Sequence, residues 1–120
     1  MESVKQILEH LDTTVKQLNI GELHEIKNKG YMNLSIEKIG SNRVSVAHYH
    51  RQRGDLMSDP EIVFKIQDQQ WIPVRYTQHP GIHQHNENGL PQAQEFCKHW
   101  NQQLKKQGYL QAAKSKTREA

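Results

Sequence analysis

The chain lacks most of the features that announce a catalytic, secreted or membrane protein. Cys97 is the only cysteine among its 120 residues, so no internal disulfide can form. No run approaches the roughly 20 apolar residues that cross a bilayer, which excludes a transmembrane span. The start, Met1-Glu2-Ser3-Val4, lacks the basic-then-apolar layout of a secretory signal, and no glycine-rich phosphate loop is found. We therefore expect a soluble cytoplasmic protein.

Composition and charge suit a single small domain with a polar end. Apolar residues make up 34% and charged residues 24%, which leaves enough aliphatic and aromatic side chains for one core. The formal net charge is +3, and part of this excess lies near the C-terminus at Lys105, Lys106, Lys114, Lys116 and Arg118. Because polar chain ends are commonly disordered, we predict one domain over 1–110 and a flexible basic tail over 111–120.

Two segments have the three- and four-residue spacing of apolar side chains that is typical of amphipathic helices. The first spans 4–18, and the polar segment 19–30 after it is predicted as a loop. The second begins at Pro91, a favourable first-turn residue, and ends before Gly108. Cys97 lies on the apolar stripe of this second helix, so we interpret it as a core residue rather than a nucleophile.

Between the two helices, apolar and polar residues alternate as in β-strands with one wet face. The predicted strands cover 30–40, 43–50, 61–67, 71–77 and, more briefly, 82–85. Pro73 cannot donate a ladder hydrogen bond, so the fourth strand should lie at an edge of the sheet or place Pro73 where its nitrogen faces outward, and we favour the edge. An antiparallel meander of four to five strands, with an N-terminal and a C-terminal helix packed on one face, gives a two-layer α+β fold.

The sheet face away from the helices is predicted to be open and to carry aromatic and basic side chains. Alternation along the strands places Tyr31, Tyr49, Val63, Trp71 and Arg75 on this face. Such a surface suits the binding of a protein partner. The plainer alternative is that these are scattered exposed residues without a function.

The segment 48–61, where a strand runs into a turn, has the densest concentration of chemically active side chains. Two pairs of histidines, each pair two residues apart, can bring four imidazoles to one ion if their strands are adjacent. Carboxylates of the turn could complete a nitrogen and oxygen shell. The candidate ligands are His48, His50, Asp55, Asp59, His83 and His85. Histidine pairs also occur in wet loops, so we expect no cofactor and keep a divalent metal as an alternative.

The same turn contains the residue types that acid–base catalysis needs, since Asp55, Asp59 and Glu61 follow the first histidine pair. However, the Glu-x-Lys step of metal-dependent nucleases is missing before Lys65. Asp55 after Gly54 can accept hydrogen bonds from turn amides, and Asp59 before a proline can start the next strand. We therefore favour turn-building as the role of this motif.

Nucleic-acid binding is a second alternative, because arginines and aromatic residues can contact a phosphate backbone and stack on bases. The residues available for it are Arg43, Arg51, Arg53, Arg75, Tyr49, Trp71 and Tyr76, together with the lysines of the C-terminal tail. Charges of both signs are mixed along the chain, which counts against this alternative. The predicted binding surface consists of Tyr49, Arg51, Arg53, Trp71 and Arg75.

Three segments, HYHRQRGDLMSDPEIVF, VRYTQHPGIHQ and FCKHWNQQLKKQGYL, carry a resemblance to a known family. They resemble an uncharacterised family of small bacterial proteins found on plasmids, phages and integrative elements. The match covers about Tyr31 to Leu110 and is most specific in the run Gly54-Asp55-Leu56-Met57-Ser58-Asp59-Pro60. Gln78 also matches, whereas His79 stands where an aspartate is usual. The resemblance implies an accessory protein of a mobile element and supplies no activity.

These observations predict a non-enzymatic accessory or interaction module of a mobile genetic element, which binds a protein partner through the exposed sheet face. The first alternative is the histidine and carboxylate metal site, with hydrolysis of nucleic acid or nucleotide as its activity. The second alternative is a nucleic-acid-binding module. The identity of the partner, the strand order and the existence of a homodimer stay open at this stage.

Overall fold

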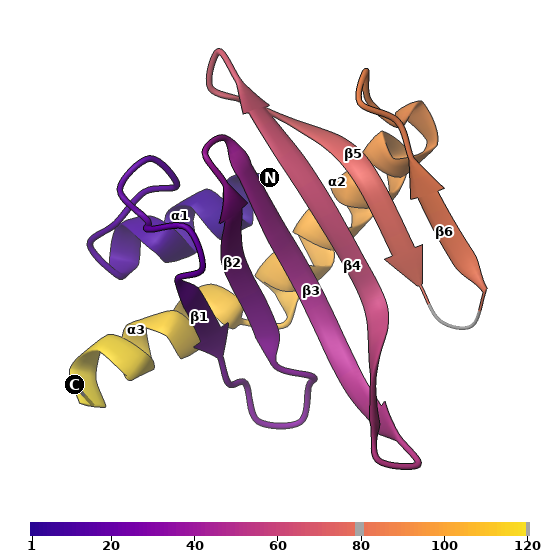
Figure 1. Cartoon of the computed structure of the whole chain (residues 1–120). Helices are drawn as coiled ribbons and strands as arrows, with labels where there is room; N and C mark the ends of the chain where they lie inside the picture. Colours follow the sequence, from indigo (N-terminus) through magenta and orange to yellow (C-terminus); the bar gives the residue numbers. More distant parts are fainter. Residues whose placement is uncertain (79–80, 120) are drawn as a thin grey trace.

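The computed structural model describes residues 1–78 and 81–119, without the side chains at 50–52, 55–56 and 115–119. Figure 1 shows the arrangement of its helices and strands. In chain order these are α1 (Glu2–His10), β1 (Leu23–Ile26), β2 (Leu34–Gly40), β3 (Arg43–Gln52), β4 (Asp55–Gln67), β5 (Gln70–Gln78), β6 (Ile82–His85), α2 (Pro91–Lys106) and α3 (Tyr109–Glu119).

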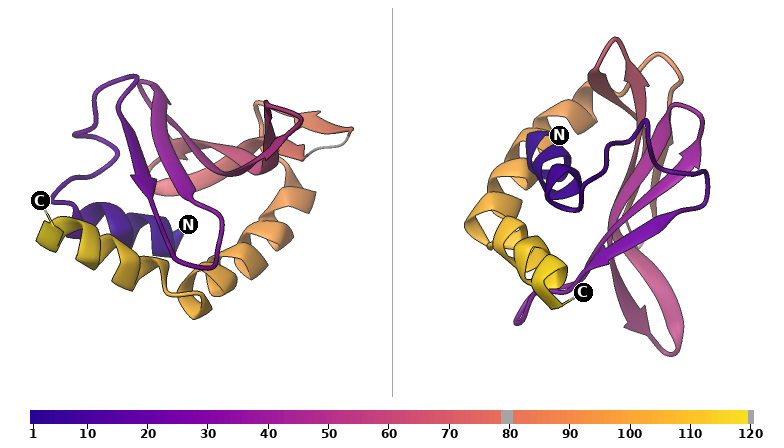
Figure 2. Two further views of the ribbon diagram at one scale, coloured as in Figure 1. Left: turned by 90° about the horizontal axis from the view of Figure 1, so that it is seen from below. Right: turned by 90° about the vertical axis from the view of Figure 1, so that its left-hand side faces the viewer.

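The strands form one antiparallel sheet in sequence order, from β1 at one edge to β6 at the other. Helices α1, α2 and α3 all lie on the same face of this sheet (Figure 2). The predicted α+β meander is therefore confirmed, although within the described residues the sheet has six strands rather than four or five. None of the helices within the described residues has the length and apolar content needed to span a bilayer.

The core lies between the sheet and the helices. The central strands contribute every second residue to it, namely Leu34, Ile36, Val44, Val46, Ile62 and Phe64, each at most 1% exposed. The helices contribute Val4, Ile7, Leu8, Trp100, Leu104 and Tyr109. The residues between the core-facing strand positions point to the opposite side, which no helix of the described part of the chain covers and which we call the open face.

Helix α1 ends at His10, eight residues before the predicted end at Leu18. Asp12 adopts a left-handed conformation with φ 59°, and its N–H donates to the carbonyl of Glu9 at 3.0 Å. The N–H of Thr13 donates to the carbonyl of Leu8 at 3.0 Å, which completes a Schellman motif. Leu18 is still buried in the core, but it reaches the core from the loop rather than from a helix.

Two elements, β1 and α3, are absent from the sequence prediction. Strand β1 is only four residues long and has a single buried residue, Ile26, so its alternation is too short to detect. Helix α3 follows Gly108, which ends α2 with φ 81°, and it buries Tyr109 and Ala113. The boundary predicted at 111, where a flexible tail was expected to begin, therefore falls inside α3, which packs against the core through Ala113.

A bulge in β5 changes which side chains face the core. Arg75 pairs with Val63 and Pro73 pairs with Phe64, so Val74 is an extra residue that shifts the alternation by one. Trp71 consequently faces the helices, with its ring centroid 5.4 Å from that of Phe64. Its predicted place on the exposed face is wrong, because the prediction assumed unbroken alternation.

The prediction that the fourth strand lies at an edge is also wrong, since β5 lies between β4 and β6. Strand β6 pairs only with the part of β5 from Arg75 to Gln78. Pro73 lies beyond that part, so its missing N–H breaks no ladder hydrogen bond to β6. Its carbonyl accepts a hydrogen bond from the N–H of Leu90 at 2.8 Å.

The β4–β5 turn offers a test of backbone conformation. Asp68 and Gln69 have φ of 51° and 66° between the paired residues Gln67 and Gln70, as in a type I′ turn, which favours Asp-Gly. Gln69→Gly is expected to raise the free energy of unfolding by about 0.5–1 kcal/mol in urea titrations, because glycine adopts positive φ without steric cost. The matched variant Gln67→Gly, in the strand, should lower it. Equal effects of the two substitutions would contradict the assignment of the turn.

Candidate functional site

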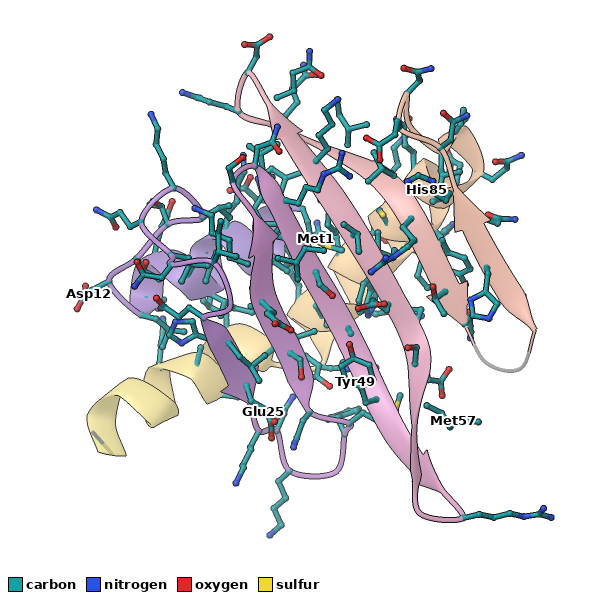
Figure 3. All side chains as sticks on the ribbon, in the orientation of Figure 1. Met1, Asp12, Glu25, Tyr49, Met57 and His85 are labelled. Carbon is teal, nitrogen blue, oxygen red and sulfur yellow. The ribbon has the colours of Figure 1, made fainter. Side chains whose placement is uncertain are left out.

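Four polar residues gather near the centre of the open face. Ser45 and Tyr49 come from β3, Glu61 from β4 and Arg75 from β5, and we call them the Glu61 cluster. Their places follow from register, because Ser45 pairs with Val63 and Arg75 pairs with the same Val63 on the other side. Figure 3 views the molecule from the open face and shows Tyr49 there.

The carboxylate of Glu61 is the centre of this cluster. Ser45 Oγ donates to Glu61 Oε2 at 2.7 Å, and the Tyr49 hydroxyl donates to the same oxygen at 3.1 Å. Arg75 Nη2 lies 3.8 Å from the other oxygen, Oε1. The Glu61 side chain is only 18% exposed, so these contacts compensate for its partial loss of water. The carboxylate is thus fixed in place by side chains from two neighbouring strands.

Tyr49 is a hydrogen-bond donor in this arrangement rather than a base. Burial, the charge of Glu61 and the hydrogen bond to Glu61 together raise the pKa of Tyr49 to about 12. The phenol therefore stays protonated at neutral pH and keeps its proton directed at the carboxylate. Glu61 already accepts a hydrogen bond from Ser45. The cluster is therefore better suited to presenting fixed polar groups to a ligand than to acting as a general base.

Beside the Glu61 cluster, β1, β2 and β3 enclose a hollow of about 430 Å³, which we call the acidic hollow. Its polar lining consists of Glu25, Asn33, Ser35, Glu37, Ser45 and Tyr49, with Leu23 at the edge. Asn33 Nδ2 donates to Glu25 Oε1 at 2.8 Å, which positions that carboxylate. No lysine, arginine or histidine is among the described residues that line the hollow.

Two basic residues considered for nucleic-acid binding are paired with acids on this side of the molecule. The Arg43 guanidinium donates to Glu87, and His85 Nε2 lies 2.9 Å from the other oxygen of Glu87. These partners, Arg43 first, lower the pKa of Glu87. Arg75 lies beside Glu61 as described above. Local pairing leaves these arginines less free to bind phosphate than the sequence suggested.

Among the described candidate histidines, His48 does not converge with His83 and His85 as the metal hypothesis required. His48 is only 5% exposed and faces the helices, where its ring lies 5.4 Å from Trp100 and 5.5 Å from Tyr109. His83 and His85 pair with Thr77 and Arg75, which places them on the open face. His48 therefore cannot share an ion with His83 or His85, because the sheet separates them.

The surroundings of His48 indicate a structural role in the core rather than a role as a metal ligand. Its Nδ1 lies 3.0 Å from the carbonyl oxygen of Asn33. Burial lowers its pKa, while the contact with Asn33 and the charge of Asp59 act in the opposite direction. Within the described residues, no group of three or more histidine, cysteine, aspartate or glutamate side chains is placed to hold a metal ion.

The turn motif of the sequence builds the end of the β3–β4 hairpin. Arg53 and Gly54 have φ of 54° and 84°, as in a type I′ turn, and Arg53 is exposed. Asp59 and Pro60 together oppose His48 in a bulge, and Asp59 Oδ1 accepts from Gln78 Nε2 at 3.1 Å. The side chains of His50, Arg51 and Asp55, three of the predicted site residues, lie outside the described part.

Of the predicted binding surface, Tyr49 and Arg75 lie on the open face and Trp71 does not. Tyr31 precedes β2, and its ring centroid lies 6.4 Å from that of Tyr109, on the helix side.

Cys97 is half-buried against the core, and burial raises the pKa of its thiol to about 11, in keeping with a core role.

Sequence reasoning did not single out Glu25, Glu37 or Ser45 as site residues. Glu37 was recognised only as part of a wet strand face. Pairing the two strands around the turn at Gly40 would have placed Glu37 opposite Ser45, where the structure has them. Glu25 could not have been found, because it belongs to the undetected strand β1.

Fold and site together define a small α+β domain with a six-stranded antiparallel sheet, covered by helices on one face and polar on the other. The chain belongs to a family described as a domain of unknown function, DUF6908, whose model matches residues 2–110. Comparison with curated proteins and with solved structures gave no match.

Proposed function

We propose that this protein is a non-enzymatic interaction module whose open face binds a basic segment of a protein partner. The observation that carries the proposal is the acidic hollow, where Glu25 and Glu37 line a space of about 430 Å³ without a basic side chain among its described residues. An arginine or lysine side chain matches this lining in charge and in hydrogen-bonding capacity.

Three features of the open face favour a cation. The Glu61 carboxylate lies beside the hollow and adds a further negative charge, only partly offset by Arg75 at 3.8 Å. Tyr49 is among the residues that line the hollow, and an aromatic side chain can attract a cation. The Ser35 hydroxyl adds a hydrogen-bond acceptor. The protein as a whole carries a net positive charge, so the acidic hollow is opposite in charge to the protein as a whole.

The wider role we propose is that of an accessory protein of a mobile genetic element, acting in the cytoplasm. This part of the proposal depends on the resemblance of the segment from Gly54 to Pro60 to proteins of plasmids, phages and integrative elements. The polar open face suits a partner that binds and leaves, because an obligate interface is usually more apolar.

The direct test is a calorimetric titration of the protein with an oligoarginine peptide and, separately, with an oligoglutamate peptide of equal length. We expect saturable binding of the basic peptide alone. Glu37→Gln should weaken it roughly fivefold, since removing one charge from a pair costs about 1 kcal/mol. The hydroxyl and aromatic groups of the hollow remain in this variant, so the effect reports on the charge.

Glu95→Gln is the matched control, because it removes the same charge from the exposed surface of α2, away from the open face. It should leave peptide affinity unchanged. A loss with Glu95→Gln equal to that with Glu37→Gln would mean non-specific attraction. Binding of the acidic peptide, or of neither peptide, would also refute the proposed function.

A further inference from the structure

A second cavity shares no residue with the Glu61 cluster or with the acidic hollow. It has a volume of about 630 Å³, within the range of small-molecule sites, and is bounded by α1, the loop after α1, and the β2–β3 and β4–β5 turns. Figure 1 shows these two turns at the same end of the sheet. We call this cavity the end pocket.

The end pocket has an apolar, aromatic floor. Trp71 lines it, and the same indole packs on Phe64 in the core, with ring centroids 5.4 Å apart. Leu8, Val15 and Ile66 complete the floor, and all but Leu8 are only half-buried. A tryptophan ring fixed by the core and accessible from a cavity is a stacking platform for a planar ring, whatever its identity.

The rim of the end pocket carries both kinds of charge. Lys5 and Lys16 supply ammonium groups, and Lys5 Nζ donates to the Gln69 carbonyl at 3.3 Å, which holds it at the rim. Glu9 and Asp68 supply carboxylates. Ammonium groups suit phosphate oxygens, and carboxylates suit the hydroxyls of a ribose. A purely hydrocarbon ligand would match the floor and leave all four charged groups without a counterpart.

We propose that the end pocket binds a mononucleotide, with its base on Trp71, its ribose hydroxyls at the carboxylates and its phosphate at Lys16 and Lys5. This single class of ligand accounts for the aromatic floor, the cationic rim and the anionic rim together. The inference is independent of the proposed function, because no residue of the acidic hollow takes part in it.

The test uses AMP, adenosine and inorganic phosphate as separate probes, titrated into the full-length protein and followed by calorimetry and by amide chemical shifts. We expect AMP to bind, adenosine to bind about fivefold more weakly and phosphate alone not to bind at the same concentrations. Lys16→Ala should bring the affinity for AMP closer to that for adenosine, with Lys5 retaining part of the phosphate contribution, and leave the affinity for adenosine unaffected. Trp71→Phe, which keeps an aromatic side chain against the core, should weaken both nucleosidic ligands.

Lys105→Ala, at the exposed C-terminal end of α2, is the matched control and should change nothing. The proposal is overturned if AMP shows no saturable binding tighter than about 1 mM. It is also overturned if phosphate alone binds as well as AMP, or if Lys105→Ala weakens binding as much as Lys16→Ala. Because Glu37→Gln leaves this pocket intact, failure here is distinguishable from failure of the open-face proposal.

Discussion

Trp100→Ala is expected to lower the free energy of unfolding by about 3–5 kcal/mol, a large part of the roughly 5–15 kcal/mol of a small domain. Trp100 is 3% exposed and joins α2 to the centre of the sheet. Its ring lies 5.4 Å from that of His48 and 6.0 Å from that of Phe96. Alanine would leave a cavity that these rigid rings cannot fill, so the lost contacts are not recovered.

Thermal and urea unfolding measure this effect, and we expect a melting temperature about 10–20 °C lower. The neighbouring His99→Ala is the matched control, because His99 is exposed on the same helix and alanine favours a helix at either position. It should change the free energy by less than about 0.5 kcal/mol. If Trp100→Ala were as stable as His99→Ala, the result would contradict the packing of Trp100 between α2 and the sheet.

The elements with long, regular patterns were predictable from the sequence. Helix α2 begins at Pro91 and ends just before Gly108, as predicted, because sixteen residues repeat one apolar stripe between two clear end signals. Strands β2, β3 and the second half of β4 follow from alternation, since their core positions are apolar except for Lys38 and His48. Here local pattern and tertiary packing agree, which is the condition under which sequence reasoning succeeds.

The failures have local causes. Leu18 continues the spacing of α1 and is buried, yet Asp12 in a left-handed conformation has already ended the helix. Periodicity detects which residues are buried, but it does not detect a turn that interrupts the backbone between them. In β5, Val74 is apolar and buried in the phase that alternation predicts, so nothing in the pattern reveals the bulge that turns Trp71 towards the core.

The candidate site was predictable only in part, because a site depends on strand register. Tyr49 and Arg75 were assigned to the open face correctly, but their common partner Glu61 was considered only as a catalytic acid. The pairing of Ala47 with Glu61, and the bulge at Asp59 and Pro60 that follows, bring the Tyr49 hydroxyl to Glu61. A bulge of this kind changes the register of the whole hairpin, and the sequence carries no direct signal of it.

The histidine pairs show the same dependence on the third dimension. His48 and His83 each stand two residues before a second histidine in a predicted strand, but His48 faces the core and His83 faces the open side. A neutral imidazole can be buried in a core when its N–H donates a hydrogen bond to a backbone carbonyl. The metal hypothesis required the two histidine pairs to meet, and the sheet separates His48 from His83 and His85.

Burial of His48 predicts that the protein loses stability in mild acid. In the folded state the pKa of His48 is lowered, chiefly by burial, whereas in the unfolded chain it returns to about 6.5. The unfolded state therefore binds a proton at a higher pH than the folded state. By linkage, this contribution is absent above about pH 6.5 and destabilises the fold as the pH falls from there towards the folded pKa.

His48→Phe separates this effect from the titration of other groups. Phenylalanine keeps an aromatic ring between Trp100 and Tyr109 and cannot take up a proton. At neutral pH the variant should be about 1 kcal/mol less stable, because the contact with the Asn33 carbonyl is lost. Urea titrations between about pH 7.5 and 5 should then show a shallower loss of stability than in the wild type. His99→Gln, on the exposed side of α2, should retain the wild-type slope, and equal slopes in all three proteins would mean that His48 is solvated or already charged in the folded state.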